Sequence, residues 1–281
     1  MVEDIGELVE VKSFAKLNLF LDVLKKRGDG YHEISSIMQT ISLHDTLTFE
    51  KIERGFHLES TVNVPGENSI KKAYEIFKRE VGLSFGVRVK LFKRIPMGTG
   101  LGGGSSNAAA ILKYLASQTG LSDKDLLEIA AKVGSDVPFF LKCGTALVSG
   151  RGELIERLDD LPKYGVDLAI PRVRISTAEA YSWLREDDFE KSKCSPLELY
   201  EAYRLKDKSL IVECSYNVFQ EVILKEFWEI RSALKYLEKK NPIVAMMTGS
   251  GSAVFGVLSQ NSGTFSFVSS NCELVENKKP M

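Results

Sequence analysis

The sequence predicts an α+β protein whose antiparallel strands and helices follow one another without the regular alternation of a parallel sheet. Two observations carry this prediction. Residues 9–23 alternate like a half-buried strand, with leucines on one face and Lys16 and Asn18 on the other. Apolar residues between 219 and 237 recur at helical spacing until Pro242. Both element types are therefore expected.

The first half of the chain carries further patterns in order. The predicted elements are a turn at 25–30, strands at 36–42, 45–53 and 86–95, and helices at 68–81, 105–119 and 122–133. An Asp-Gly pair marks the turn. Ser122 supplies a helix N-cap, and Gly120 and Gly134 end the two later helices.

A polar stretch at 159–165 marks the expected boundary between two domains, residues 1–160 and 161–281. The predicted elements beyond it are strands at 166–170, 243–247 and 253–258 and an exposed, partly helical insertion at 186–208. No internal repeat is present, and the tail beyond Gln260 carries no usable pattern.

Composition excludes several classes of function. The formal net charge is −1 with no long basic run, which disfavours nucleic acid as the main partner. The acidic N-terminus does not resemble a signal peptide, and no apolar run is long enough to cross a bilayer. The four cysteines have no close pair, so we expect a reducing cytoplasm with neither a disulfide framework nor a zinc site. The three histidines have no ligand spacing, so no structural transition metal is expected.

The most informative segment is a glycine-rich loop that opens into an alanine-rich helix. Five of the seven residues 98–104 are glycine. Such a backbone can bring several N–H groups to one anion, and the free amides of the following helix point to the same place. The segment therefore predicts a phosphate site, and specifically one for a nucleoside triphosphate.

Other interpretations of this loop fit less well. Gly98, Gly100 and Gly103 match G-x-G-x-x-G, but Asp123 and Asp125 begin a helix where a dinucleotide fold needs an acidic strand end. A P-loop is excluded because no lysine ends the segment. A plain surface linker would not lead straight into a helix.

Three polar residues have an ordinary structural interpretation beside a functional one. Lys16 and Asn18 lie about 7 Å apart along one strand face, where a lysine is most often a solvated edge residue. Asp136 follows Gly134 and precedes Pro138, a position typical of a turn or helix cap. Taken singly, none of them indicates catalysis.

Three further residues and one glycine-rich segment also have an ordinary structural interpretation beside a functional one. Thr177 fits a helix N-cap, and Tyr31 and His32 fit residues that pack on the sheet. The glycine-rich segment 248–252 is either a second phosphate site or a hairpin turn.

Taken together, these segments resemble the GHMP kinase superfamily from about residue 12 to residue 258. In chain order they are residues 15–19, 28–32, 96–106, 134–138, 175–177 and 248–251. The pair formed by 29–32 and 98–106 is similar to the branch that phosphorylates cytidine diphosphate-linked methylerythritol in non-mevalonate isoprenoid biosynthesis. The resemblance implies an N-terminal βα nucleotide-binding domain, like domain 2 of ribosomal protein S5, and a C-terminal ferredoxin-like domain, with the site in the cleft between them.

The resemblance also implies roles for individual residues. Asp136 would be the general base and Lys16 its cationic neighbour. The implied ATP contacts are Asn68, Pro96, Met97, Gly98, Thr99, Gly100, Leu101, Gly102, Gly103, Gly104, Ser105 and Ser106. The implied acceptor contacts are Asn18, Tyr31, His32, Thr177, Tyr181, Gly249, Ser250 and Gly251. Tyr31 and Tyr181 would stack on the cytosine, and His32 would read its edge.

Mg²⁺ is expected with ATP but without an assigned protein ligand, since Ser106 is only a weak candidate. The expected state is a cytoplasmic monomer or homodimer with no nucleic-acid or membrane partner. The alternatives are a kinase of mevalonate, homoserine or a sugar, a catalytically silent sensor on the same scaffold, and an RNA-binding module. The aromatic residues, the presence of both Lys16 and Asp136, and the neutral charge balance argue against these in turn.

Overall fold

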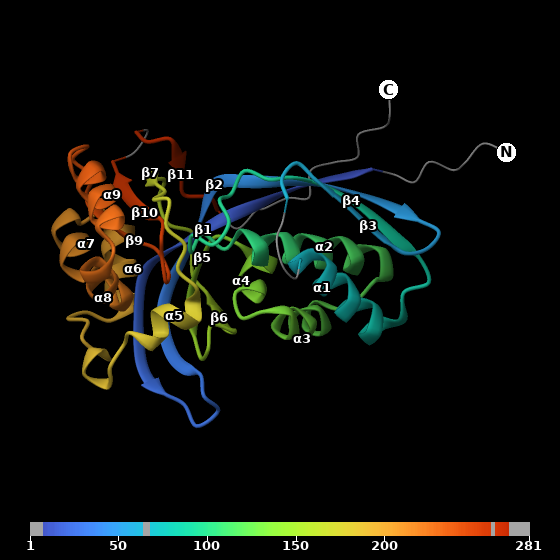
Figure 1. Cartoon of the computed structure of the whole chain (residues 1–281), viewed down its shortest axis with the longest axis horizontal. Coiled ribbons are helices and arrows are strands. Elements are labelled where there is room, and N and C mark those ends of the chain that lie inside the picture. The colour runs from blue at the N-terminus through green and yellow to red at the C-terminus, as the bar shows by residue number, and fades with distance from the viewer. Residues whose placement is uncertain (1–7, 64–67, 260–261, 270–281) are drawn as a thin grey trace.

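A long antiparallel hairpin of β1 (Val9–Lys26) and β2 (His32–Ile52) forms the centre of the fold. The structure is a computed structural model that describes residues 8–63, 68–259 and 262–269. Figure 1 shows the hairpin running between a helical half and a half that contains a second sheet. Its apolar face is buried, with Leu17 and Leu19 fully enclosed.

Seven of the described strands form the larger sheet, in the order β3-β4-β2-β1-β8, with β5 paired to β2 and β6 paired to β5. The remaining members are β3 (Phe56–Ser60), β4 (Gly86–Phe92), β5 (Thr145–Ser149), β6 (Leu154–Arg157) and β8 (Tyr216–Asn217). β8 pairs in parallel with β1. The chain therefore returns to the central hairpin late in its course.

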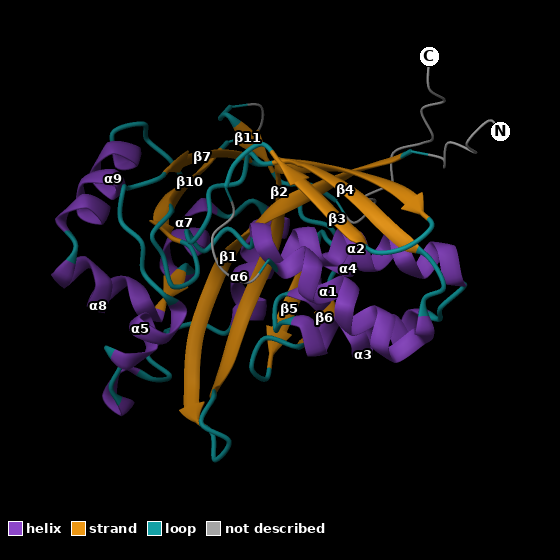
Figure 2. Cartoon of the chain, turned by 45° about the vertical axis from the view of Figure 1, so that its right-hand side comes forward, coloured by secondary structure: helices purple, strands orange, loops and turns teal. Residues whose placement is uncertain are grey.

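Helices cover one face of this sheet (Figure 2). They are α1 (Ser69–Phe77) with a π-helical turn (Lys78–Gly82), α2 (Gly103–Thr119), α3 (Asp123–Val133) and α4 (Val137–Lys142). The alanine-rich α2 lies against the sheet, where Tyr114 stacks on Phe49 with ring centroids 4.8 Å apart. This core holds α2, and with it the end of the glycine-rich loop, against the sheet.

The second sheet has the order β11-β7-β10-β9. Its strands are β7 (Gly165–Ala169), β9 (Val244–Met247), β10 (Val254–Leu258) and β11 (Phe265–Ser266). The accompanying helices are α5 (Thr177–Ser182), a 3₁₀ turn (Glu186–Asp188), α6 (Pro196–Leu205), α7 (Lys208–Cys214), α8 (Val218–Glu226) and α9 (Trp228–Glu238).

The predicted α+β class is confirmed. The observed elements differ from the predicted ones mainly in where one element ends and the next begins. The two strands predicted at 36–42 and 45–53 are one strand, β2, because an irregular register opposite Phe14 and Ala15 bends it without ending it. The helix predicted over 219–237 is two helices that meet at the extended Phe227. The insertion at 186–208 is partly helical, as expected.

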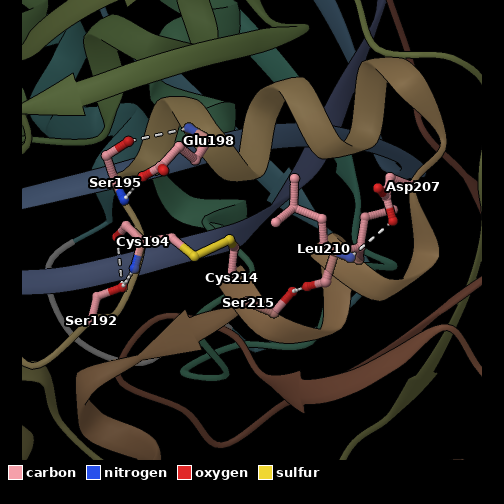
Figure 3. Close-up of a disulfide and its surroundings, with 9 residues drawn as sticks. Ser192, Cys194, Ser195, Glu198, Asp207, Leu210, Cys214 and Ser215 are labelled. Carbon is pink, nitrogen blue, oxygen red and sulfur yellow. Dashed lines mark hydrogen bonds between the residues drawn. A yellow bond between two sulfur atoms is a disulfide. The ribbon is translucent and has the colours of Figure 1, made fainter.

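The expectation of no disulfide is wrong. Cys194 and Cys214 form a disulfide (Figure 3) although twenty positions separate them in the sequence. Cys194 lies just before Ser195, the N-cap of α6, and Cys214 ends α7. These helices fold back on one another so that the two Cα atoms lie 5.2 Å apart. Sequence spacing alone does not reveal this helical hairpin.

Across the described ranges, no helix combines the length and apolar character needed to cross a bilayer.

Candidate active site

The glycine-rich loop connects β4 to α2 with an open, left-handed backbone. Gly98, Gly100 and Gly102 have φ values of 70°, 79° and 73°. Gly102 is the N-cap of α2 and offers no side chain to the helix start. The first amides of α2 therefore remain available to an anion, as the phosphate prediction requires.

Close packing is a second reason for glycine in this loop. A Cβ atom on Gly102 would lie 2.7 Å from the Phe140 ring, and one on Gly100 would collide with the Thr248 carbonyl oxygen. The Thr99 carbonyl also accepts a hydrogen bond from the Ala253 amide at 3.1 Å. The loop thus touches the glycine-rich segment between β9 and β10.

Lys16 and Asp136 lie together beside this loop. The lysine ammonium is 3.8 Å from the Asp136 carboxylate. Asp136 is the N-cap residue of α4, but its side chain makes no capping hydrogen bond. Its carboxylate is therefore not used as a helix cap, and one-third of the side chain is exposed.

Lys16 is not the solvated edge residue that its strand position suggests. Only 4% of it is exposed, and its backbone amide donates to the Leu101 carbonyl at 3.0 Å. Burial lowers the pKa of Lys16, and the Asp136 carboxylate opposes that shift. The ammonium donates to the Asn18 side-chain oxygen at 2.5 Å, which fixes its direction.

Asn18 connects the Lys16–Asp136 pair to the second sheet. Its backbone amide donates to the Thr248 hydroxyl at 2.9 Å, and its side-chain amide donates to the Ser36 hydroxyl at 2.8 Å. Asn217 holds the same segment from the other side by donating to the Met247 and Gly249 carbonyls. The segment 248–252 is the β9–β10 connection and also a wall of the site.

Aromatic side chains gather at the other end of the site. The His32 ring stacks on Tyr181 with centroids 4.6 Å apart, and Phe219 packs edge-on against Tyr181 at 4.9 Å. Tyr31 is 54% exposed, and the Arg151 guanidinium lies 4.8 Å from its ring centroid. Burial and the charge of Lys26 lower the pKa of His32, so its imidazole is neutral at pH 7.

Thr177 is the first residue of α5, and the N-cap is the preceding Ser176. The Thr177 hydroxyl lies 3.3 Å from the Ser250 hydroxyl. These two residues therefore join α5 to the β9–β10 connection at the rim of the site.

A cleft of about 920 Å³ joins these parts. Every residue implied by the resemblance lines it except Ser106 and Gly251. Ser106 instead lies behind the loop, where its hydroxyl accepts from Ser13 at 2.6 Å. Asn68 lines the cleft while its side chain also caps α1 through the Ile70 amide.

Some residues of the cleft wall escaped the sequence prediction. They include Ser69, Lys93, Asn107, Ser135, Arg151 and Phe219. Ser69, Asn107 and Ser135 are each next to a predicted site residue in the sequence. That proximity could have identified them as candidates. Arg151 follows β5 without any distinctive local pattern.

Within residues 8–63, 68–259 and 262–269 there is no group of three or more histidine, cysteine or carboxylate side chains that could hold a metal. The Ser106 hydroxyl is 3% exposed and bonded to Ser13. These residues do not form a protein cage for Mg²⁺.

Comparisons with known proteins agree with this geometry. The family of GHMP kinases N terminal domains matches residues 68–144. The 4-diphosphocytidyl-2-C-methyl-D-erythritol kinase of Thermotoga maritima is 52% identical over 269 residues, covering 95% of this chain and 99% of that protein. The chain belongs to this kinase family. The enzyme of the same name from Petrotoga mobilis is 39% identical over 90% of this chain and all of that protein.

Solved structures extend the family assignment to the fold. The crystal structure of a 4-(cytidine 5'-diphospho)-2C-methyl-D-erythritol kinase matches with a TM-score of 0.78 and 33% identity, covering 88% of this chain and 89% of that one. The crystal structure of L. major mevalonate kinase in complex with R-mevalonate matches with a TM-score of 0.68 but only 13% identity, covering 90% of this chain and 87% of that one. That distant likeness shows the shared GHMP kinase fold alone.

Proposed function

We propose that this protein transfers the γ-phosphoryl group of ATP to a hydroxyl of 4-diphosphocytidyl-2-C-methyl-D-erythritol, giving the 2-phosphate for non-mevalonate isoprenoid biosynthesis. One observation carries the proposal. The Lys16–Asp136 pair lies in a single cleft with the glycine-rich loop at one end and the aromatic cluster of His32 and Tyr181 at the other. The names of the full-length relatives support the choice of acceptor.

The glycine-rich loop and the start of α2 bind the ATP phosphates. Backbone amides do this work, so the site stabilises negative charge without a P-loop lysine. Asn68 and Ser69 begin α1 and lie on the same wall of the cleft, toward the nucleoside.

Asp136 accepts the proton of the acceptor hydroxyl as the hydroxyl oxygen attacks the γ-phosphorus. The bond from that phosphorus to the bridging oxygen breaks, and ADP leaves with the electron pair. Lys16 lies 3.8 Å from Asp136 and offsets charge on the transferred group. Positioning and electrostatics dominate phosphoryl transfer, and a buried, directed ammonium supplies both.

The cytidine end of the acceptor binds at the aromatic cluster. Tyr31 and Tyr181 offer stacking surfaces, and neutral His32 can both donate to and accept from a base edge. Thr177, Asn18 and the segment 249–251 contact the remainder of the acceptor.

Mg²⁺ neutralises charge on the ATP phosphates when it is bound. The described residues offer no acidic cage for it, so no protein ligand is assigned. The protein residues above act on the proton and the phosphoryl group directly.

We further propose that residues 1–160 provide most of the ATP site and residues 161–281 the second wall. The enzyme would act in the cytoplasm, where ATP is supplied, as a monomer or homodimer. Neither nucleic acid nor a membrane is a proposed partner.

A kinase assay with ATP and different acceptors tests the function. The cytidine-linked methylerythritol should be phosphorylated, and mevalonate, homoserine and simple sugars should not. Turnover of one of those alternatives without turnover of the cytidine-linked acceptor would assign a different superfamily kinase. Binding of both ligands without turnover would indicate a silent sensor.

A further inference from the structure

A fully buried carboxylate lies directly behind the glycine-rich loop. Asp45 of β2 has no exposed surface. Its Oδ1 atom accepts the backbone amides of Arg94 and Ile95, each at 2.7 Å. Those two residues are the last before the loop begins at Pro96, so Asp45 holds the entry of the loop.

The other oxygen of the same carboxylate holds the exit. Asp45 Oδ2 accepts from the Asn107 side-chain amide at 3.0 Å, and Asn107 lies in the second turn of α2. The same oxygen is 2.9 Å from the Lys93 ammonium, which also donates to the Ile95 carbonyl. One side chain thus joins the two ends of the loop.

The neighbouring strand adds a second connection. Ser13 of β1 pairs directly opposite Asp45 in the hairpin register. Its hydroxyl donates to the Ser106 hydroxyl at 2.6 Å, and both serines are 3% exposed. The centre of the sheet therefore binds the first turns of α2 through two adjacent residues.

This arrangement has an energetic consequence for a glycine-rich loop. Glycine backbones lose much conformational freedom when they become ordered. A buried carboxylate also needs its donors, because leaving it without them is costly. Here the donors belong to the two ends of the loop. The Asp45 carboxylate therefore gains its hydrogen bonds only when both loop ends are ordered. Preordering a site lowers the cost of binding its ligand.

We propose that Asp45, assisted by Ser13, is a positioning residue for the ATP-phosphate loop. Asp45 touches neither substrate and acts through the backbone of residues 94–107. The inference rests on the proposed function only in taking this loop as the ATP-phosphate site.

The Asp45→Asn variant tests the proposal. The amide can still accept the Arg94 and Ile95 amides, but its nitrogen would face Asn107 and Lys93, which are both donors. Isothermal titration calorimetry on the full chain would measure a non-hydrolysable ATP analogue and the cytidine-linked acceptor separately. We expect the Kd for the ATP analogue to rise at least tenfold and the Kd for the acceptor to stay within twofold.

Asp167→Asn is the matched control. Asp167 of β7 also pairs with a lysine, Lys240 at 2.8 Å, and accepts a backbone amide, that of Thr264 at 2.8 Å. It does not line the cleft. This variant should lower the unfolding temperature without changing the Kd for the ATP analogue.

A folded Asp45→Asn protein that binds the ATP analogue normally, or that loses both ligands equally, would overturn the proposal. If Asp45→Asn does not fold, Ser13→Ala decides, with a two- to fivefold weaker ATP analogue expected and unchanged affinity contradicting the role. A wild-type protein that binds ATP but does not phosphorylate the acceptor would refute the proposed function alone. The role of Asp45 is tested by the affinity for the ATP analogue and does not depend on turnover.

Discussion

The Lys16 ammonium lies 3.8 Å from the Asp136 carboxylate, and the two side chains differ sharply in exposure. The lysine side chain is 5% exposed and the aspartate side chain is 33% exposed. The cation is therefore fixed inside the protein, while the carboxylate faces the cleft. This asymmetry suits the roles proposed above, with Asp136 as the base and Lys16 as its counter-charge.

Replacing Asp136 by asparagine removes the base while keeping the shape of the side chain. Turnover should fall by roughly 10²–10⁴-fold, the usual size of a general-base contribution. The Kd for ATP should change little. A steady-state assay with calorimetry on the same preparation checks both, and near-normal turnover would leave Asp136 as a turn residue only.

Lys16→Met should also reduce turnover, because it removes the positive charge that stabilises the transferred phosphoryl group. Since both residues have proposed roles on one proton and one phosphoryl group, the double variant should lose less than the sum of the single losses in activation free energy. Fully additive losses would mean that the residues work independently.

The sequence predicted the parts of this site better than their surroundings. Lys16, Asp136 and the glycine-rich loop each belong to a short local motif, and the cleft joins them. Arg151 belongs to no such motif, and its contact with Tyr31 depends on how two hairpins approach one another. Side-chain contacts of that kind are set by tertiary packing.

The same reasoning explains which parts of the fold escaped prediction. Alternating strands and capped helices were visible because periodicity is local. The short α4 and β6 contain too few residues to display a period. From the sequence, Asp45 was only the first residue of the strand predicted at 45–53, because its four donors come from segments about fifty and sixty positions away.

The aromatic cluster predicts different results for its two tyrosines. Tyr31→Ala should cost roughly 1–3 kcal/mol of acceptor binding, typical of one base–aromatic stack. Tyr181→Ala should cost more, because it also removes the ring on which His32 stacks. Calorimetry with the acceptor and with ATP checks this, and equal weakening of both ligands would indicate a folding defect instead.

Tyr181→Phe is the control for that experiment. Burial raises the pKa of Tyr181 to about 12, so its hydroxyl stays neutral at any working pH. Phenylalanine keeps the ring and should bind the acceptor nearly as well. A large loss would show that the hydroxyl, and not the ring, recognises the substrate.

Two glycines of the loop offer a matched pair of substitutions. Gly98 and Gly100 both have positive φ values, so alanine at either position carries a backbone penalty of about 1–2 kcal/mol. A Cβ on Gly98 meets open space, whereas one on Gly100 collides with Thr248. Gly98→Ala should weaken ATP alone, and Gly100→Ala should weaken ATP and the acceptor together. Binding assays with each ligand distinguish the two, and identical behaviour would contradict the contact between the two loops.

The Cys194–Cys214 disulfide should contribute to stability and not to catalysis. It closes a loop with a sequence separation of 20, which corresponds to about 3 kcal/mol from the reduced entropy of the unfolded chain. Neither cysteine lines the cleft. Cys194→Ser should therefore lower the unfolding temperature by on the order of 10 °C while leaving kcat unchanged at temperatures where the variant is folded.

Reductant should lower the unfolding temperature of the wild type toward that of the variant and should leave the variant unaffected. If reductant shifts both proteins equally, the stabilisation does not come from this bond. If Cys194→Ser loses activity while fully folded, the link between α6 and α7 reaches the active site after all.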